Sequence, residues 1–483
     1  MSLVTCLALS IAAIGTATAL AIVRLVLAIG VVTPASRSGK GRGESTLAFF
    51  HPFAECGGGG ERVLWAAIDA LSKESARTKS KTRRFTKVLI YCQDVSTREK
   101  TSEEVLAEHA NSRFNLAVSP SSFRVIPIRY RNLLVPENYP RLTMIFQALA
   151  SVLVTVECLL RGRSLPDIWV DTTGWAFGYP LLKLLKTDIK VVAYVHYPTV
   201  SSDMLLRVKK REASYNNRQA VSRSRVLSLA KATYYQLFSY WYGFCGGCAD
   251  VCMVNSSWTK GHVEEIFWWR GNRATTLVYP PCDCTALSTV KLDGRDAHVK
   301  QIVSLAQYRP EKNHEIQLDA VALVRHQNFK VLFIGGCRDA GDFQRVEKLK
   351  SRAAERGLDD GTVEFLVNVP FSDLRRALGE SIAGLHSMKD EHFGISVVEY
   401  MAAGVIPIAH NSAGPRMDIV TPDTGYLCDT AEDYAAAMEA VLKMDERARI
   451  EMGAKCRDRA TTFGQEKFQA SFLDALWESS AHH

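Results

Sequence analysis

Two stretches of this 483-residue chain alternate short apolar runs with longer segments of helical pattern. In the first stretch, the expected strands are 47–50, 88–92, 123–127, 168–171 and 191–196. In the second, they are 302–306, 330–334, 362–365 and 383–387, and a further helix and strand fall within 397–409. Strands that alternate with helices predict a parallel sheet covered by helices on both faces. The sequence therefore predicts an α/β protein with two Rossmann-like, doubly wound domains.

The boundary between the two domains is expected near Pro280-Pro281. We expect an N-terminal domain over 46–283, a C-terminal domain over 284–455, and a C-terminal helix over 456–483 that can pack back on the N-terminal domain. Two such domains in tandem face a cleft at the carboxyl ends of their strands, where ligands bind. Hydrophobic residues make up 47% of the chain and charged residues 23%, which excludes a mostly disordered chain and a multi-span transporter.

An apolar run precedes the first domain, and residues 3–23 contain no charge. At about 1.5 Å per residue, this run spans roughly 31 Å, the thickness of a bilayer core. A cleaved signal peptide would have basic residues before a shorter apolar run. We therefore expect an uncleaved transmembrane anchor over 1–34 and a basic linker over 35–45. Four basic residues come before the first acidic one: Arg24, Arg37, Lys40 and Arg42. Because positive charge stays on the cytosolic side, the domains should be cytosolic.

The net charge of +8 is concentrated locally. Segment 206–231 carries eight Lys or Arg and one Glu, and segment 73–87 carries seven basic residues and one acid. Each is either a solvated loop or a surface for anionic lipid headgroups or a lipid-linked diphosphate. Nucleic acid is not an expected partner, because no nucleic-acid motif accompanies the charge. The apolar run 145–160 is short for a membrane span, so it is either a core helix or a membrane-dipping helix.

The twelve cysteines are expected to remain thiols, because disulfides are rare in the cytosol. Cys245-Gly-Gly-Cys248 could be half of a zinc site, but Cys282-x-Cys284 has the wrong spacing for the other half. No His lies beside either pair. We therefore expect small buried residues here and no metal site.

A glycine-rich loop, His51-Pro-Phe-Ala-Glu-Cys-Gly-Gly-Gly-Gly-Glu61-Arg62, follows the first strand of the first domain. Its glycines let backbone amides approach a ligand, and the helix that follows adds the positive end of its dipole. This suits a phosphate or a sugar hydroxyl, although a tight turn alone is an alternative. The loop lacks the G-x-G-x-x-G pattern of a nicotinamide site. His196 ends another strand at the same cleft, and both a structural and a functional role remain open for it.

In the second domain, Arg309 and Lys312 follow the first strand. A guanidinium fork and an ammonium together suit a diphosphate, although a surface basic pair is the alternative. Glu391 and Glu399 stand eight residues apart, one in a loop and one on a helix, where they can hold hydroxyls of one ligand. Ser396-x-x-Glu399 also predicts a capping box, and Gly404 suits the end of the same helix. Gly394 would let main-chain amides face an anion.

Glu391-x7-Glu399, the Arg309/Lys312 pair and the glycine-rich loop together resemble the retaining GT-B glycosyltransferases of the family that includes sucrose synthase and the phosphatidylinositol mannosyltransferases. Segments 51–65, 194–204 and 307–314 more closely resemble the α-1,2-mannosyltransferases that extend the dolichol-linked oligosaccharide of asparagine-linked glycosylation. The resemblance covers almost everything after the anchor.

The resemblance implies that GDP-mannose donates mannose, twice and with retention, to Man3GlcNAc2-PP-dolichol at the cytosolic face of the endoplasmic reticulum membrane. GDP-mannose would be a substrate, so no cofactor is expected. No metal is expected either, because no D-x-D-like metal motif is evident. Other mannosyltransferases of the pathway are conceivable partners. A GT-B transferase for another nucleotide sugar or lipid-linked acceptor is the alternative, and the intact Glu391, Glu399, Arg309 and Lys312 disfavour a catalytically dead membrane scaffold.

The same resemblance implies a role for each candidate residue. Arg309 and Lys312 would neutralise the leaving diphosphate, and Glu399 would hold the donor ribose. Glu391 would orient the mannose hydroxyls, and His196 would contact the transferred sugar. Further donor contacts would come from Gly58, Gly59, Gly394 and Ile395. The acceptor or its diphosphate would meet Glu61, Arg62, Arg207, Lys209 and Lys210.

Overall fold

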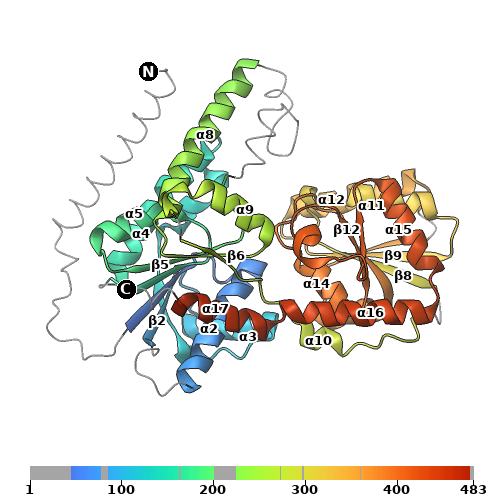
Figure 1. Ribbon diagram of the computed structural model, residues 1–483, viewed down its shortest axis with the longest axis horizontal. Helices are drawn as coiled ribbons and strands as arrows, with labels where there is room; N and C mark the ends of the chain where they lie inside the picture. The colour runs from blue at the N-terminus through green and yellow to red at the C-terminus, as the bar shows by residue number, and fades with distance from the viewer. Residues whose placement is uncertain are drawn as a thin grey trace. The chain divides into compact units, whose positions relative to one another are not determined.

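The computed structural model describes residues 45–77, 85–162, 165–200, 225–271, 273–295, 299–358 and 361–478. The expected anchor over 1–34, nearly all of the linker, and Arg207, Lys209 and Lys210 lie outside these residues. The chain divides into two compact units (Figure 1). Unit 1 contains the chain up to Asn255, Thr259–Val278 and the segment from Gln469 onward. Unit 2 contains Ser256–Trp258 and Tyr279–Phe468.

Unit 1 is built on a seven-stranded parallel sheet with the order β3-β2-β1-β4-β5-β6-β7. Its strands are β1 (Ser45–Phe50), β2 (Phe85–Cys92), β3 (Arg124–Pro127), β4 (Ile168–Asp171), β5 (Lys190–Val195), β6 (Val251–Val254) and β7 (Thr275–Leu277). The central strands are continuous apolar runs because helices cover both of their faces. The strand order reverses between β1 and β4, which places a topological switch point there.

The helices of unit 1 form two layers. They are α2 (Gly59–Arg77), α3 (Ser102–Phe114), α4 (Thr143–Gly162), α5 (Tyr179–Leu185), α8 (Arg225–Gly247), α9 (Ser257–Ile266) and α17 (Gln465–Glu478). Figure 1 shows α2, α3 and α17 on one face of the sheet and α4, α5, α8 and α9 on the other. The C-terminal helix is fixed in unit 1, because the Gln469 side chain donates to the buried Asp69 carboxylate at 2.7 Å and Lys190 donates to the Leu476 carbonyl.

Unit 2 is built on a six-stranded parallel sheet with the order β10-β9-β8-β11-β12-β13. Its strands are β8 (Lys300–Leu305), β9 (Phe329–Gly335), β10 (Val363–Val367), β11 (Ser381–His386), β12 (Ile406–His410) and β13 (Tyr426–Cys428). Its helices are α10 (Cys284–Ser288), α11 (His314–Val324), α12 (Ala340–Glu355), α13 (Phe371–Glu380), α14 (Ile395–Ala402), α15 (Ala431–Lys443) and α16 (Glu446–Ala460). Here the switch point lies between β8 and β11.

The Tyr400 side chain joins these two strands. Its hydroxyl accepts a hydrogen bond from the Leu305 amide at 2.5 Å and donates one to the Leu385 carbonyl at 3.0 Å. The ring lies so close to Gly384 that a β-carbon there would overlap it, so glycine in the middle of β11 is a packing requirement. These bonds fix the edge of the sheet from which the candidate site is built.

The prediction of two doubly wound α/β domains is confirmed, but some local predictions are wrong. The Ser396–Glu399 capping box does not form, because α14 begins directly after Gly394 and Ser396 already lies in its first turn. Gly404 does end this helix, with a φ of +70°. Helix α2 begins at Gly59, inside the loop that was expected to run to Arg62, so two of the four loop glycines are helical.

Candidate active site

Three charged or titratable side chains meet at the switch point of unit 2. Lys312 follows β8, and its Nζ lies 2.5 Å from Oε2 of Glu391, which follows β11. Nε2 of His386, the last residue of β11, lies 3.2 Å from the same oxygen. Ligands of doubly wound sheets bind at this place, so the cluster is the first candidate for the active site.

The chain after β8 is fixed to the chain after β11 by backbone contacts. A short helix, η7 (Pro310–Lys312), turns Lys312 back over the sheet, and Asn313 follows with a φ of +49°. The Ser387 hydroxyl donates to the carbonyls of Lys312 and Asn313 at 2.7 and 3.0 Å. The Gln317 amide in turn donates to the Ser387 oxygen at 2.6 Å. Lys312 is therefore held at this position by buried polar contacts.

The electrostatics of the cluster favour an ionised Glu391. Burial alone would raise the pKa of Glu391, but the Lys312 ammonium and the His386 ring hold that pKa well below its usual range. The side chains of Lys312 and Glu391 are 20% and 15% exposed, so the pair is accessible at one edge. Such a site presents a carboxylate that can accept sugar hydroxyls next to a cation that can meet a phosphate.

Arg309 directly precedes η7 in the chain. Its Nη1 is 4.0 Å from Oε1 of Glu311, and its buried Nε has no hydrogen-bond partner among the described residues. Burial lowers the pKa of Arg309, and the charge of Arg338 in the chain after β9 lowers it further. The guanidinium therefore retains donors that an anionic ligand could use.

Gly394, Ile395 and Glu399 border the same edge. Gly394 has a φ of +112°, which a residue with a side chain rarely adopts, and α14 starts from it. The first amides of a helix have no partner within the helix, so Ile395 can present an N–H to a ligand. Glu399 is half-buried one turn further along α14. The Gly414 amide donates to the Glu391 carbonyl at 3.0 Å and fixes the loop that carries Glu391.

A second cluster lies at the switch point of unit 1. His51, after β1, shares a hydrogen bond of 2.7 Å through Nδ1 with Oγ1 of Thr172, after β4. Its Nε2 lies 3.4 Å from Oε1 of Glu61, and the other Glu61 oxygen accepts the Gly58 amide at 2.6 Å. Burial would raise the pKa of Glu61, but the bond to His51 makes the net shift downward. The glycine-rich loop is therefore folded over a carboxylate.

His196 completes this cluster from the end of β5. A β-carbon on Gly60 would lie 3.6 Å from its Nε2, so the missing side chain keeps space beside the imidazole. The ring also packs on Tyr194, with 4.9 Å between centroids. Arg62, in the first turn of α2, has its Nε and Nη2 buried without a hydrogen-bond partner among the described residues. Gly59, the first residue of α2, is exposed.

Sequence reasoning missed two residues of unit 1 and one of unit 2. Asp171 is fully buried and accepts bonds from Thr173, Gly174 and the Tyr179 hydroxyl at 2.7 to 3.1 Å. Burial raises its pKa. The signal was available, because an acidic residue at the carboxyl end of a buried strand is unusual. Thr172 and His386 gave no such signal in the sequence.

Comparisons with known proteins agree with this arrangement. Residues 44–267 match the family model described as ALG11 mannosyltransferase N-terminus, and residues 293–461 match glycosyl transferases group 1. A GDP-Man:Man(3)GlcNAc(2)-PP-Dol alpha-1,2-mannosyltransferase of Xenopus tropicalis is 41% identical over 90% of this chain and 87% of its own. The chain belongs to this mannosyltransferase family. The Homo sapiens relative is 38% identical over 91% of this chain and 88% of its own.

Solved structures support the fold of this family member. Sucrose-phosphate synthase from Thermosynechococcus elongatus matches 91% of this chain and all of its own, with a TM-score of 0.62 at 16% identity. A glycosyltransferase from Rickettsia africae covers the same shares, with a TM-score of 0.61 at 14% identity. At these identities the likeness shows the fold alone. The GT-B glycosyltransferase predicted from the motifs is confirmed.

Each predicted site residue of this mannosyltransferase lies in one of the two units or outside the described residues. Unit 2 contains Arg309, Lys312, Glu391, Gly394, Ile395 and Glu399, and a direct contact joins Lys312 to Glu391. Unit 1 contains Gly58, Gly59, Glu61, Arg62 and His196, and a direct contact joins Gly58 to Glu61. Of the cysteine cluster expected to be buried, Cys245, Cys252 and Cys282 are buried thiols, whereas Cys248 and Cys284 are partly exposed. Within the ranges that the structure describes, no three His, Cys, Asp or Glu side chains are grouped to hold a metal ion.

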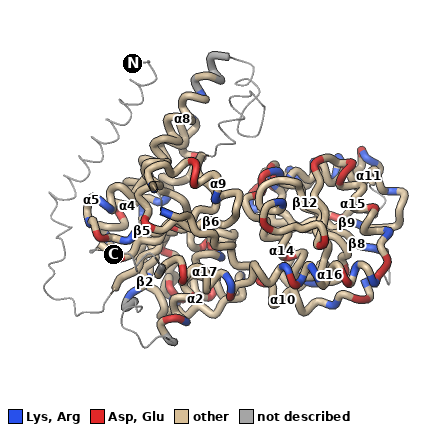
Figure 2. Tube along the Cα trace, in the orientation of Figure 1, with Lys and Arg blue, Asp and Glu red and all other residues tan. Residues whose placement is uncertain are grey.

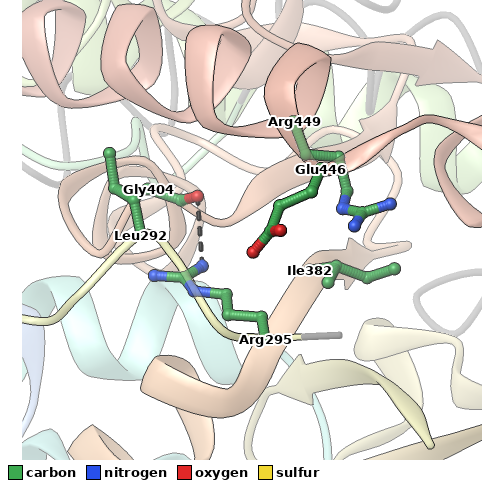
Figure 3. Close-up of a pocket in the computed structure, with 6 residues that line it drawn as sticks. All are labelled: Leu292, Arg295, Ile382, Gly404, Glu446 and Arg449. Carbon is green, nitrogen blue, oxygen red and sulfur yellow. Dashed lines mark hydrogen bonds between the residues drawn. The ribbon is translucent and has the colours of Figure 1, made fainter. Parts of the chain in front are cut away.

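A separate small pocket in unit 2 has a structural role. It is lined by Leu292, Arg295, Ile382, Gly404, Glu446 and Arg449 (Figure 3). Arg295 donates to the carbonyls of Ser381 and Ala403, each at 2.7 Å, and so neutralises the carboxyl ends of α13 and α14. Ser381 begins β11, whereas Glu391 follows the end of β11. The pocket therefore lies at the amino ends of the strands, and Glu391 at their carboxyl ends.

Proposed function

We propose that this chain transfers mannose from GDP-mannose, in α-1,2 linkage and in two successive steps, to Man3GlcNAc2-PP-dolichol. The observation that carries the proposal is the identity of 38 to 41% over about nine-tenths of the chain with enzymes named for this donor and acceptor. The contact between Lys312 and Glu391 at the switch point of unit 2 supports it. The reaction needs a cation for the diphosphate close to a group that accepts hydrogen bonds from the sugar hydroxyls.

The transfer breaks the bond between C1 of mannose and the diphosphate and forms a bond from C1 to an acceptor hydroxyl on the same face. The hydroxyl proton leaves with the departing phosphate. Arg309 and Lys312 stabilise the negative charge that develops on the diphosphate, without a metal. Glu391 accepts hydroxyls of the mannose, Glu399 binds the ribose, and the Ile395 amide after Gly394 faces a phosphate.

The cluster of unit 1 serves the sugar and the acceptor. Gly58 and Gly59 present backbone near the donor, and His196 contacts the transferred mannose. Glu61 and Arg62 meet the acceptor or its diphosphate, since the buried N–H groups of Arg62 have no hydrogen-bond partner among the described residues. No cofactor takes part, because GDP-mannose is itself a substrate.

The lipid-linked acceptor places this reaction at a membrane. We place the enzyme at the endoplasmic reticulum membrane, held by the apolar run of residues 3–23, with both units in the cytosol. Other mannosyltransferases of the same pathway are candidate partners, because each would receive or supply its acceptor.

The test is an assay of the purified full chain with radiolabelled GDP-mannose and a Man3GlcNAc2-diphosphate lipid. We expect a product with two added mannoses that α-1,2-mannosidase removes, and undiminished transfer in the presence of EDTA. Glu391→Ala should abolish transfer, whereas Glu347→Gln, at a carboxylate 70% exposed on α12, should not. Transfer from another nucleotide sugar in preference to GDP-mannose, or full activity of Glu391→Ala, would contradict the proposal.

A further inference from the structure

One helical layer of unit 1 exposes an unusual amount of apolar surface. The large hydrophobic side chains that are more than a third exposed in the described part of unit 1 are Tyr130, Leu142, Phe146, Leu149, Leu153, Leu184, Leu229, Tyr240, Phe244, Trp268 and Trp269. All lie on or beside α4, α5, α8 and two short helices, η3 (Tyr130–Leu134) and η6 (Trp268–Arg270). Helices α2, α3 and α17, on the opposite face of the sheet, contribute none of them.

Helix α4 is apolar on its outer face as well as on its inner face. Leu142, Phe146, Leu149 and Leu153 follow one another at intervals of three or four residues, which places them along one stripe, and they are 36 to 53% exposed. A helix on a water-facing surface normally has a polar outer side. Glu157, the single acidic residue of α4, does not make the outer face polar. It is buried, and its carboxylate accepts hydrogen bonds from the Arg129 and Tyr130 amides at 2.7 and 3.0 Å.

A cluster of aromatic rings stands on α8 and η6. Gly243, Gly246 and Gly247 let η6 approach α8 so closely that a β-carbon at any of them would overlap the chain from Ile266 to Trp269. This packing leaves Trp268 and Trp269 51% and 54% exposed. Phe244 lies 5.5 Å from the Trp269 ring, and the Trp268 indole donates to the Tyr240 carbonyl at 3.2 Å.

The two groups of side chains belong to one layer. The short helix η5 (Ala176–Gly178) packs between them, because the Phe177 ring lies 4.8 Å from the Trp241 ring of α8 and Gly178 closely approaches Thr155 of α4. Helix α8 contains only two charged residues, Arg225 and Lys231, and its described part is drawn mostly tan in Figure 2. The segment that leads into α4 adds the exposed Arg124, Arg129 and Arg141 against one exposed acid, Glu137.

We propose that this layer, formed by η3, α4, α5, α8 and η6, rests on a lipid bilayer. A membrane interface favours a combination of aliphatic, aromatic and basic side chains. This layer has that combination: leucine and phenylalanine along α4, tryptophan and tyrosine on α8 and η6, and arginine before α4. Helix α4 is also apolar enough to enter the bilayer, because an 18-residue window of it has a mean hydropathy of 1.9. This second contact would orient unit 1 on the membrane independently of any N-terminal anchor.

The test introduces the photo-reactive residue p-benzoylphenylalanine at Phe146 or Phe244 of the full chain in nanodiscs that contain an alkyne-labelled phospholipid. Matched controls are Phe343 and Phe371, which are 50% and 53% exposed on α12 and α13 of unit 2. We expect roughly fivefold or more lipid capture at Phe146 and Phe244. Equal capture at all four positions, or capture of a second protein chain at Phe146, would overturn the proposal.

A second measurement asks whether the contact serves the reaction, and it rests on the proposed function. Trp268→Ser combined with Trp269→Ser should lower transfer to an acceptor embedded in a bilayer about tenfold and leave transfer to a short-chain, water-soluble acceptor unchanged. Equal loss on both acceptors would refute this membrane role of the two tryptophans. Lipid capture in the first test does not depend on the donor or the acceptor, so the two proposals can fail separately.

Discussion

Replacing Lys312 by methionine separates a catalytic role of the ammonium from a structural one. The pair with Glu391 is 20% and 15% exposed, which lies between a surface pair and a fully buried pair. Removing one partner should therefore cost about 2 kcal/mol of stability, between roughly 0.5 for surface pairs and roughly 4 for buried ones. His386, at 3.2 Å from the same carboxylate oxygen, limits this loss.

The expected loss of rate is larger than the loss of stability. If Lys312 meets the leaving diphosphate, its removal should lower the rate at saturating GDP-mannose by about 10²- to 10³-fold, the usual effect of losing one preorganised charge or donor. The assay is the initial rate of mannose transfer, with thermal unfolding of the same preparation. Lys350→Met is the matched control, because Lys350 is 50% exposed on α12 and pairs with Glu347 at 2.9 Å.

The same variant should also change the response to pH. In the native protein the pKa of Glu391 is depressed, so its contribution to stability is complete above about pH 4.3, the unfolded value, and is lost as the pH falls further. Without the Lys312 ammonium, one of the charges that lower the pKa of Glu391 is gone, whereas burial still raises it. The pKa of Glu391 therefore rises, and the acid limb of the pH–rate profile moves to higher pH. A wild-type rate at saturating donor, together with an unshifted acid limb, would refute the reasoning.

Three further changes test the architecture around the site. Gly394→Ala should lower the thermal midpoint by an amount equivalent to about 1–2 kcal/mol, because of its positive φ and the side chains 3.3 to 3.4 Å from the new β-carbon, whereas Gly261→Ala in α9 meets nothing within 4 Å and should raise it. Tyr400→Phe should cost about 1–3 kcal/mol in thermal unfolding, because the buried Leu305 amide loses its acceptor; an unchanged midpoint would exclude this. Burial, followed by the charge of Lys312, lowers the pKa of His314 to about 3. Stability should therefore fall as the pH drops from about 6.5 toward 3, by at most about 1.4 kcal/mol per unit, and His314→Phe should flatten this dependence in thermal unfolding measured across pH.

The fold could be predicted because both sheets are parallel and buried on both faces, which makes each central strand a continuous apolar run. The strands that sequence reasoning missed are β6, β7 and β13. β7 and β13 have only three residues each, and so short a run gives no periodicity. β6 has four residues, like the predicted β3 and β4, but it falls inside the cysteine cluster. The two alternatives for 145–160 stayed open because only the structure shows that Glu157 is buried while Leu149 and Leu153 are exposed.

The contacts between residues of the candidate site could not be predicted from the sequence. The rule that ligands bind at carboxyl ends of strands predicted the region of Lys312 and Glu391, but their contact joins residues 79 positions apart. It exists because β11 lies beside β8, and the order of strands is a property of the whole sheet. The capping box was wrong for a local reason, because a glycine with positive φ starts α14 without help from a side chain.

The two units use different side chains to hold together the two loops at their switch points. In each, the loop after the first strand must be held against the loop after the fourth, because these strands are neighbours only through the reversal of strand order. Unit 1 uses the bond between His51 and Thr172, and unit 2 uses the Ser387 hydroxyl on the carbonyls after η7. A side chain that bonds across the switch point fixes both loops at once and satisfies its own polar atoms in doing so. The residues that we propose to bind substrate lie beside these bonds. They are Lys312 and Glu391 in one unit and Glu61 and His196 in the other.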